Sequence, residues 1–361
     1  MRELNEHDLE DLAVGAAILG TGGGGDPYIG KLLAQQAIRE HGPVTIVDVD
    51  EVADDALVVP VAMMGAPTIM LEKLASGDEI LRAVDAIASY LGRPMTHTIS
   101  AEIGGINSVF PFVLAAKRGL PIIDADLMGR AFPELQMVIP TMYGISATPM
   151  AMADEKGNAI VLSTIDNHWT ERFARSVVID MGASSLVTLY ALDGMQAREA
   201  TVPGSLRLCE ELGRIVRETR TAHGDPVAQV AARLGGFRLF DGKIADVARR
   251  TEGGFARLEA RLDGLGDDAG STLLVRSQNE HLVAELYGGE VLASTPDLIM
   301  MFDTDSGEPI TTESLRYGFR VSVIGAPCDP RWRTPEGLAL VGPRYFGYDI
   351  DYVPVEELAV R

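Results

Sequence analysis

Short apolar segments alternate with amphipathic ones through the first two thirds of the chain, and this alternation restricts the folds it can adopt. Short apolar runs predict strands at 44–50 and 56–65, a strand that runs into a glycine loop within 96–105, and a buried strand followed by a loop within 120–129. Helical spacing of apolar residues predicts helices at 7–19, from 26 to about 40, at 77–92 and at 107–119. Such β-α alternation indicates a largely parallel sheet covered by helices. We therefore predict an α/β fold class, with a three-layer α/β/α domain over residues 1–235.

The same patterns continue to the end of this domain. Further strands are predicted at 148–154, at 159–164, near 177–180 and at 185–194, and further helices at 166–176, 203–222 and 225–234.

The pattern changes after residue 235. From there short alternating runs are separated by glycine turns, and Asp-Gly at 241–242 and Gly-Gly at 288–289 are hairpin signals. We predict a second, all-β, barrel-like domain over 236–345. The remaining tail, 346–361, is expected to pack back on the first domain.

Charge and cysteine content exclude several classes of function. The chain has 31 Lys and Arg against 52 Asp and Glu, a formal charge of −21, and an acidic protein repels nucleic acid. It lacks an apolar run of about 18 residues, which a membrane span needs. With two cysteines and an acidic N-terminus without an apolar signal segment, we expect a cytoplasmic protein that binds neither nucleic acid nor membranes.

The segment 20–27, Gly-Thr-Gly-Gly-Gly-Gly-Asp-Pro, is the most unusual stretch of the chain. It matches G-x-G-x-x-G, but a dinucleotide site needs a strand before the first glycine, and a helix is predicted there. We therefore expect no nicotinamide or flavin cofactor. Two interpretations stay open: a helix end followed by a turn, or a clamp for an anion or carbonyl. The clamp would use Gly22, Gly23, Gly24, Gly25 and Asp26.

Polar residues follow the predicted strands at the edge of the sheet where ligands bind in open parallel sheets. Glu102 follows one strand, and Asp124 and Asp126 end another. Carboxylates gathered in one crevice raise each other's pKa, which suits a general acid or base. The alternative is that each aspartate caps a helix, which is a poorer explanation for Glu102. The neighbouring candidates for substrate binding are Gly104, Gly105, Asn107 and Arg130.

A metal site is left open by the sequence. The candidate ligands are His97, Glu102, Asp124, Asp126 and His168, but no compact metal-binding motif is present. A divalent metal is therefore the one cofactor that we keep under consideration.

Six motifs together resemble the S-methyl-thiohydantoin desulfurase-like family: LGTGGGGDPY, AEIGGINS, PIIDADLMGRAFPELQM, SQNEHLVA, PDLIMMFDTDSGEPITTESLRYG and VGPRYFGYDIDYVP. The resemblance covers nearly the whole chain. It implies an N-terminal α/β/α domain and a C-terminal β-barrel domain. It also implies removal of sulfur from a thiohydantoin-like five-membered ring by hydrolysis. Members of this family, long labelled a domain of unknown function, often occur near hydantoinase- or oxoprolinase-type enzymes.

Our leading hypothesis is therefore a hydrolase acting on a small cyclic amide or thioamide. Glu102, Asp124 or Asp126 would be the base, and amides of Gly22–Gly25 with Asn107 would hold the developing anion. Arg130 would bind a substrate carboxylate.

Two other hypotheses are kept. A non-catalytic partner of a hydantoinase- or oxoprolinase-type enzyme would show an exposed apolar patch on 236–345 and no organised pocket. A nucleotide-dependent enzyme would use the glycine segment. We also expect a homo-oligomer.

Overall fold

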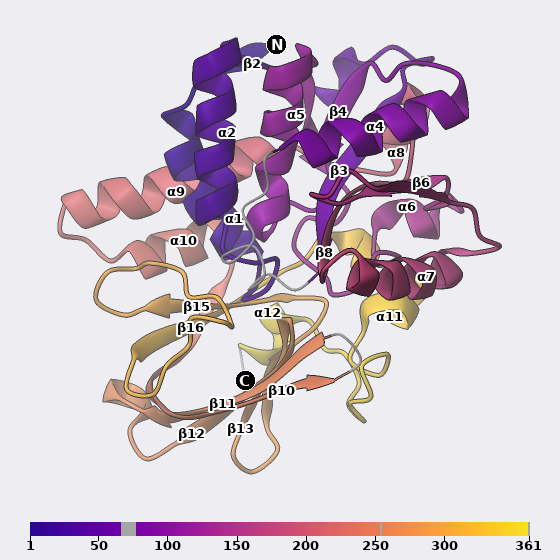
Figure 1. Ribbon diagram of the computed structural model, residues 1–361. Helices are drawn as coiled ribbons and strands as arrows, with labels where there is room; N and C mark the ends of the chain where they lie inside the picture. The colour runs from indigo at the N-terminus through magenta and orange to yellow at the C-terminus, as the bar shows by residue number, and fades with distance from the viewer. Residues whose placement is uncertain (66–76, 253–254, 360–361) are drawn as a thin grey trace.

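The computed structural model describes residues 1–65, 77–252 and 255–359, and in these residues it contains two sheets (Figure 1). The first has nine strands in the order β1-β2-β5-β4-β3-β8-β6-β7, with β9 paired to β5. These strands are β1 (Arg2–Leu4), β2 (Val44–Val47), β3 (Val58–Gly65), β4 (His97–Ser100), β5 (Ile122–Asp126), β6 (Met150–Ala153), β7 (Ala159–Leu162), β8 (Ser184–Thr188) and β9 (Val202–Pro203).

The four central strands of this sheet, β2, β5, β4 and β3, are parallel, and the outer strands extend them in antiparallel pairs. Helices cover the sheet: α5 contacts β3 and β4, α9 contacts β5, and α4 contacts β6 and β8. The principal helices are α1 (Asp8–Leu19), α2 (Tyr28–His41), α4 (Asp78–Leu91), α5 (Phe110–Arg118), α7 (Asn167–Asp180), α9 (Ser205–Thr221) and α10 (Pro226–Leu234). Shorter helices are α6 (Ile139–Met142), α8 (Gly194–Glu199), α11 (Pro335–Val341) and α12 (Val355–Leu358).

The second sheet is antiparallel and curls into a half-barrel, in the order β14-β13-β12-β11-β10-β16-β15. Its strands are β10 (Phe237–Glu252), β11 (Phe255–Gly264), β12 (Thr272–Gln278), β13 (Glu280–Leu286), β14 (Val291–Ser294), β15 (Leu298–Asp303) and β16 (Arg320–Ala326). A separate apolar cluster that includes Phe240, Leu262 and Val323 fills its concave side. The predicted fold class, an α/β region followed by a barrel-like β region, is confirmed.

Two local predictions were wrong for physical reasons. Asp241 and Gly242 lie inside β10, where Gly242 pairs with both neighbouring strands. A Cβ at Gly242 would lie 2.7 Å from the Phe240 ring, so this glycine allows close packing instead of a turn. The strand predicted near 177–180 is the last turn of α7, where Val178 is buried together with Ala174, four residues earlier on the same face of the helix.

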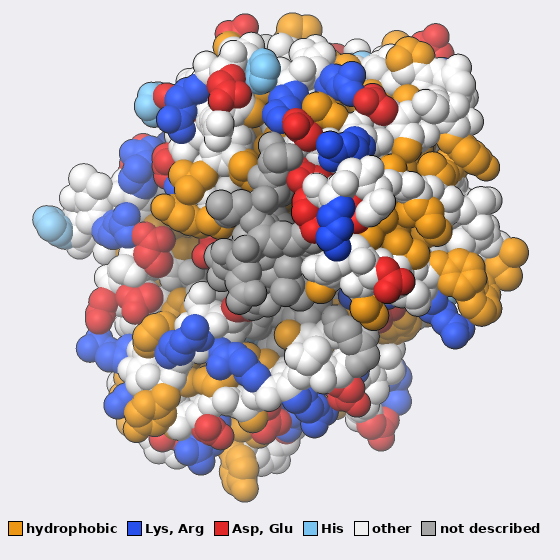
Figure 2. Space-filling view, in the orientation of Figure 1, with side chains coloured by type: hydrophobic (Ala, Val, Ile, Leu, Met, Phe, Trp, Pro, Cys, Tyr) orange, Lys and Arg blue, Asp and Glu red, His pale blue; other side chains and the backbone are white. Residues whose placement is uncertain are grey.

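The two sheets share one apolar core. Leu282, Met300 and Ile324 of the second sheet belong to the same buried cluster as the core of the first. The C-terminal tail packs on both clusters. Phe346 belongs to the cluster that the two sheets share, and Val355 belongs to the separate cluster of the second sheet. Acidic and basic side chains are interspersed over the face seen in Figure 2. Among the described helices, none has the length and apolar character to cross a bilayer.

Candidate active site between the two sheets

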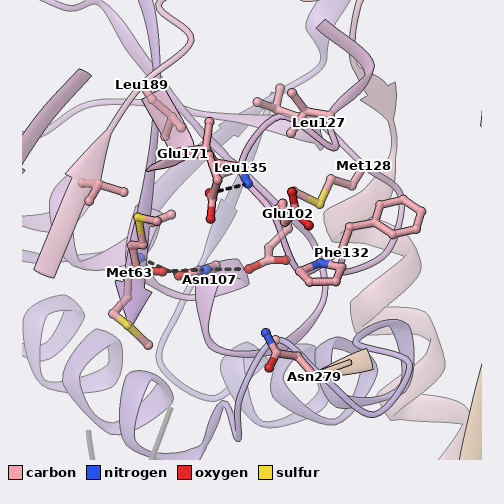
Figure 3. A pocket seen from close by; sticks show the side chains of 18 of the residues that line it. Met63, Glu102, Asn107, Leu127, Met128, Phe132, Leu135, Glu171, Leu189 and Asn279 are labelled. Carbon is pink, nitrogen blue, oxygen red and sulfur yellow. Dashed lines mark hydrogen bonds between the residues drawn. The ribbon is translucent and has the colours of Figure 1, made fainter. Parts of the chain in front are cut away.

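A cavity lies where the carboxyl ends of the parallel strands meet the second sheet. The space between its walls is about 900 Å³ when the part open to solvent is included. Its walls come from the end of β3, the segments that follow β4 and β5, β8, α7 and two segments of the second sheet. This is the edge where the sequence places polar residues, and Figure 3 shows two of them, Glu102 and Asn107, among the residues that line the cavity.

Glu102 follows β4 and is held by its neighbour Asn107. The Asn107 amide nitrogen donates to Glu102 Oε1 at 2.5 Å and to the Met63 carbonyl at 3.2 Å, while Asn107 Oδ1 accepts from the Met63 amide at 2.6 Å (Figure 3). Burial, helped by the negative charge of Glu280, raises the pKa of Glu102 to about 8. Glu102 is therefore a fixed carboxyl group that retains its proton at neutral pH.

Glu280 reaches the same cavity from the second sheet, as the first residue of β13. Its Oε1 accepts the Gly24 amide at 3.1 Å, and its Oε2 has no hydrogen-bond partner among the described residues, although it is buried. Burial raises the pKa of Glu280 to about 7, and the nearby Arg130 charge and the Gly24 amide limit this rise. The free oxygen can accept a proton or a hydrogen bond from a bound molecule.

The glycines at 22–24 leave the space that Glu280 and His281 occupy beside the first domain. A Cβ at Gly23 would lie 2.1 Å from Glu280 Oε1, and one at Gly22 would lie 2.5 Å from His281 Nε2. A Cβ at Gly24, whose φ is +71°, would meet the Gly104 carbonyl at 2.6 Å. Gly23 and Gly24 line the cavity, so this segment is a close junction between the first domain and β13.

The other residues predicted to form the clamp or to bind substrate through glycine lie beside the cavity. Gly22, Gly104 and Gly105 pack around the junction without lining the cavity, and Gly25 is buried and also outside the cavity lining. Asp26 is exposed and accepts the Tyr28 amide at 2.9 Å, at the start of α2.

The two aspartates of β5 are buried but do not line the cavity. Asp126 Oδ2 accepts three backbone amides, from Ile103 at 2.9 Å, Met128 at 3.0 Å and Gly129 at 2.8 Å. Burial nevertheless raises the pKa of Asp126 to about 7. Asp124 Oδ1 accepts the Arg207 amide at 3.1 Å, at the start of α9. Both aspartates therefore hold backbone segments in place around the site.

Arg130 is fully buried behind the cavity and spans the two parts of the molecule. Its guanidinium donates to the carbonyls of Pro296 and Asp297 at 2.7 and 2.8 Å, and to Thr21 Oγ1 at 2.8 Å. It also lies 4.4 Å from the centre of the Phe132 ring. The guanidinium is thus directed at protein groups and not at the cavity.

Several cavity residues were not among the candidates drawn from the sequence. Glu171 of α7 is buried, accepts the Leu135 amide at 3.1 Å through Oε2 and forms an ion pair with Arg175. Burial raises its pKa. Asn279 and Glu280 lie in the SQNEHL stretch, and this polar run inside an otherwise alternating β region was the signal that could have identified them.

The candidate metal ligands are not brought together. His97 begins β4, at the end of the strand away from Glu102, and His168 is exposed at the start of α7. Within the described ranges, no group of three or more His, Cys, Asp or Glu side chains has a geometry that could hold a metal ion.

Comparisons with known proteins agree on the family across the chain. Residues 7–164 match the family described as S-Me-THD-like, N-terminal domain, and residues 165–355 match S-Me-THD-like, C-terminal domain. The family bounds divide the chain between β7 and α7. The resemblance seen in the motifs is confirmed.

One similar solved structure is the X-ray crystal structure of a protein from Chromobacterium violaceum, a structural genomics target. It has 26% sequence identity and a TM-score of 0.81, and the match covers 98% of this chain and 100% of that one. None of the curated proteins matches this chain.

Proposed function

Because the chain belongs to the S-Me-THD-like family, we propose that it hydrolyses a thiohydantoin-like five-membered ring and releases its sulfur. The observation that carries the proposal is the pair of buried glutamates, Glu102 and Glu280, in one cavity. Their pKa values are raised to about 8 and about 7, so between these two pH values Glu102 mostly holds its proton and Glu280 has mostly lost its own. Two carboxyl groups in opposite protonation states form an acid-base pair.

The pair supplies both proton transfers of a hydrolysis. Glu280 takes a proton from water as the hydroxyl adds to ring carbon C2, and Glu102 protonates the sulfur as the C=S double bond opens. The hydroxyl proton of the adduct then passes to Glu102 as C2=O forms. Hydrosulfide leaves and takes the proton from Glu280, so the sum is thiohydantoin plus water giving hydantoin plus H₂S. A ring that carries an S-methyl group would release methanethiol instead.

The walls of the cavity suit such a ring. Four methionines, Met63, Met64, Met128 and Met150, line it together with leucine and phenylalanine side chains. Thioether sulfur is soft and polarisable, and it packs well against a sulfur-containing ring of low polarity. Apolar walls also exclude water, which maintains the raised pKa values of the glutamates.

The glycine amides and Asn107 take a different role in this proposal from the one predicted by the sequence. The Gly24 amide donates to Glu280, and both hydrogens of the Asn107 side-chain amide are engaged by Glu102 and Met63. We assign Gly24 and Asn107 to positioning the two glutamates. The organised cavity also favours an enzyme over a partner subunit, for which no such pocket is expected.

The experiment uses the purified protein with 2-thiohydantoin and its S-methyl derivative, and measures hydrosulfide and methanethiol. Parallel reactions in ¹⁸O-labelled water test the hydrolytic step. We expect sulfur release accompanied by one ¹⁸O atom at C2 of the hydantoin. A folded protein that releases no sulfur from either ring, or that yields unlabelled hydantoin, would refute the proposal.

A further inference from the structure

A second hollow adjoins the cavity that holds the two glutamates. The two share Glu134, Glu171 and Arg175 as lining residues, so these side chains form the boundary between them. The outer hollow is lined in addition by Trp169, Arg172, Phe173, Ser176 and Phe255. All but Phe255, which begins β11, come from α7.

The outer hollow is built from flat side chains. The rings of Trp169 and Phe173 lie 5.3 Å apart at 52°, and Arg172 lies 4.4 Å from the centre of the Trp169 ring. Arg175 lies 4.1 Å from the centre of the Phe255 ring. Phe173 is 47% exposed, so an aromatic face is open to solvent beside the cavity. Aromatic rings and guanidinium planes both stack well on a third flat group.

The boundary between the two hollows is held by hydrogen bonds and an ion pair. Arg175 is paired with Glu171 and donates to the Pro133 carbonyl at 3.0 Å, and Glu171 also accepts the Leu135 amide at 3.1 Å. The hollow contains two carboxylates, Glu134 and Glu171, and two guanidinium groups. Their formal charges cancel, which favours a neutral occupant over a charged one.

We propose that the outer hollow is a subsite for a neutral aromatic substituent on the substrate ring. The inference rests on the proposed function, because it places the five-membered ring beside Glu102 and Glu280. A substituent at C5 would pass Glu171 and Arg175 and stack in the outer hollow. The substrate class would then be thiohydantoins that carry an arylmethyl group, the ring form of an aromatic amino acid.

The test measures binding of two product-like ligands, 5-benzylhydantoin and 5-methylhydantoin, by titration calorimetry. We expect the benzyl compound to bind at least about tenfold more tightly, from stacking and burial of its ring. Trp169→Ala and Phe173→Ala should each reduce this preference and leave the affinity for the methyl compound unchanged. Ile179→Ala is the matched control, because Ile179 is a 72% exposed apolar residue of the same helix outside the hollow.

Equal affinity for the two ligands, binding of neither, or an equal loss in the Ile179→Ala variant would overturn the subsite. The two proposals fail in different ways. Sulfur release from unsubstituted thiohydantoin without a preference for the benzyl ligand would remove the subsite and leave the proposed function standing. Selective binding of the benzyl ligand without sulfur release from any ring would support the subsite and remove the proposed chemistry.

Discussion

Glu102 and Glu280 belong to segments attached to different sheets, yet they line one cavity, and burial together with the negative charge of Glu280 raises the pKa of Glu102. The backbone amide of Gly24 donates a hydrogen bond to Glu280, and the side-chain amide of Asn107 donates one to Glu102. The two sheets must therefore dock correctly before the proposed acid-base pair is assembled.

The rate should depend on pH as a bell-shaped curve. As pH falls below about 7, Glu280 becomes protonated and the base is lost, and as pH rises above about 8, Glu102 ionises and the acid is lost. The maximum of kcat/KM is expected between these values. Initial rates of sulfur release from about pH 5 to about pH 10 measure the curve. A flat profile across neutrality, or a maximum in acid, would be inconsistent with the assigned roles.

The same pKa values predict how stability changes with pH. Both glutamates have folded-state pKa values above the usual 4.5, so the folded protein binds more protons than the unfolded chain between about pH 4.5 and pH 8. Their contribution to stability is fully present below the unfolded value and is lost as pH rises, by up to about 1.4 kcal/mol per pH unit for each group.

Replacing either glutamate with glutamine removes this loss. For Glu102→Gln and Glu280→Gln, the Tm difference between variant and wild type should therefore be larger, in favour of the variant, at about pH 8 than at about pH 5. Thermal unfolding measured at both pH values tests this, with the exposed Glu290→Gln as the control. A Tm difference that does not change with pH would contradict the raised pKa values.

Gly23→Ala should impair turnover through Glu280. The new methyl group would lie 2.1 Å from Glu280 Oε1, and the flexible end of that side chain must move away while the backbone stays in place. We expect a fall in kcat/KM of about 10²-fold, comparable to loss of a general base. A double-mutant cycle with Glu280→Gln provides the check: the two losses should not add, and fully additive losses would show that Gly23 acts elsewhere.

Part of the site could be predicted from the sequence. Glu102 was found because a carboxylate before a glycine pair, at the end of a parallel strand, is poorly explained by helix capping. Asp124 and Asp126 occupy an equivalent place at the end of β5, but their oxygens accept backbone amides instead of facing the cavity. The spacing of residues does not show which way a carboxylate turns once the following segment folds back on it.

The sequence marks Glu280 as part of an unusual polar run but does not predict that it shares a cavity with Glu102, because this depends on how the second sheet docks on the first. That docking uses the Gly24 amide and the carbonyl of Thr21, which accepts the His281 amide at 2.8 Å. Such contacts join segments far apart in the chain, and periodicity reports only on local structure. The turn predicted at Gly242 was wrong for the same reason, because its neighbours on both sides come from other strands, which local sequence does not reveal.

Asn107→Ala should change both the pH profile and the stability. The hydrogen bond from Asn107 lowers the pKa of Glu102, so its removal should move the alkaline limb of the kcat/KM curve to higher pH. The Met63 amide and carbonyl would lose their side-chain partner, at a cost of about 1–3 kcal/mol. Rate profiles and chemical unfolding measure the two effects. An unmoved alkaline limb would mean that Asn107 does not act on Glu102.

The most direct test of the account is sulfur release by wild type, Glu102→Gln and Glu280→Gln in the same assay, with Asp124→Asn as a buried carboxylate outside the cavity. We predict that each glutamine variant stays folded and loses about 10²–10⁴-fold in kcat, while Asp124→Asn keeps most of its activity. Wild-type rates in both glutamine variants would contradict the assignment of the two glutamates as the catalytic pair.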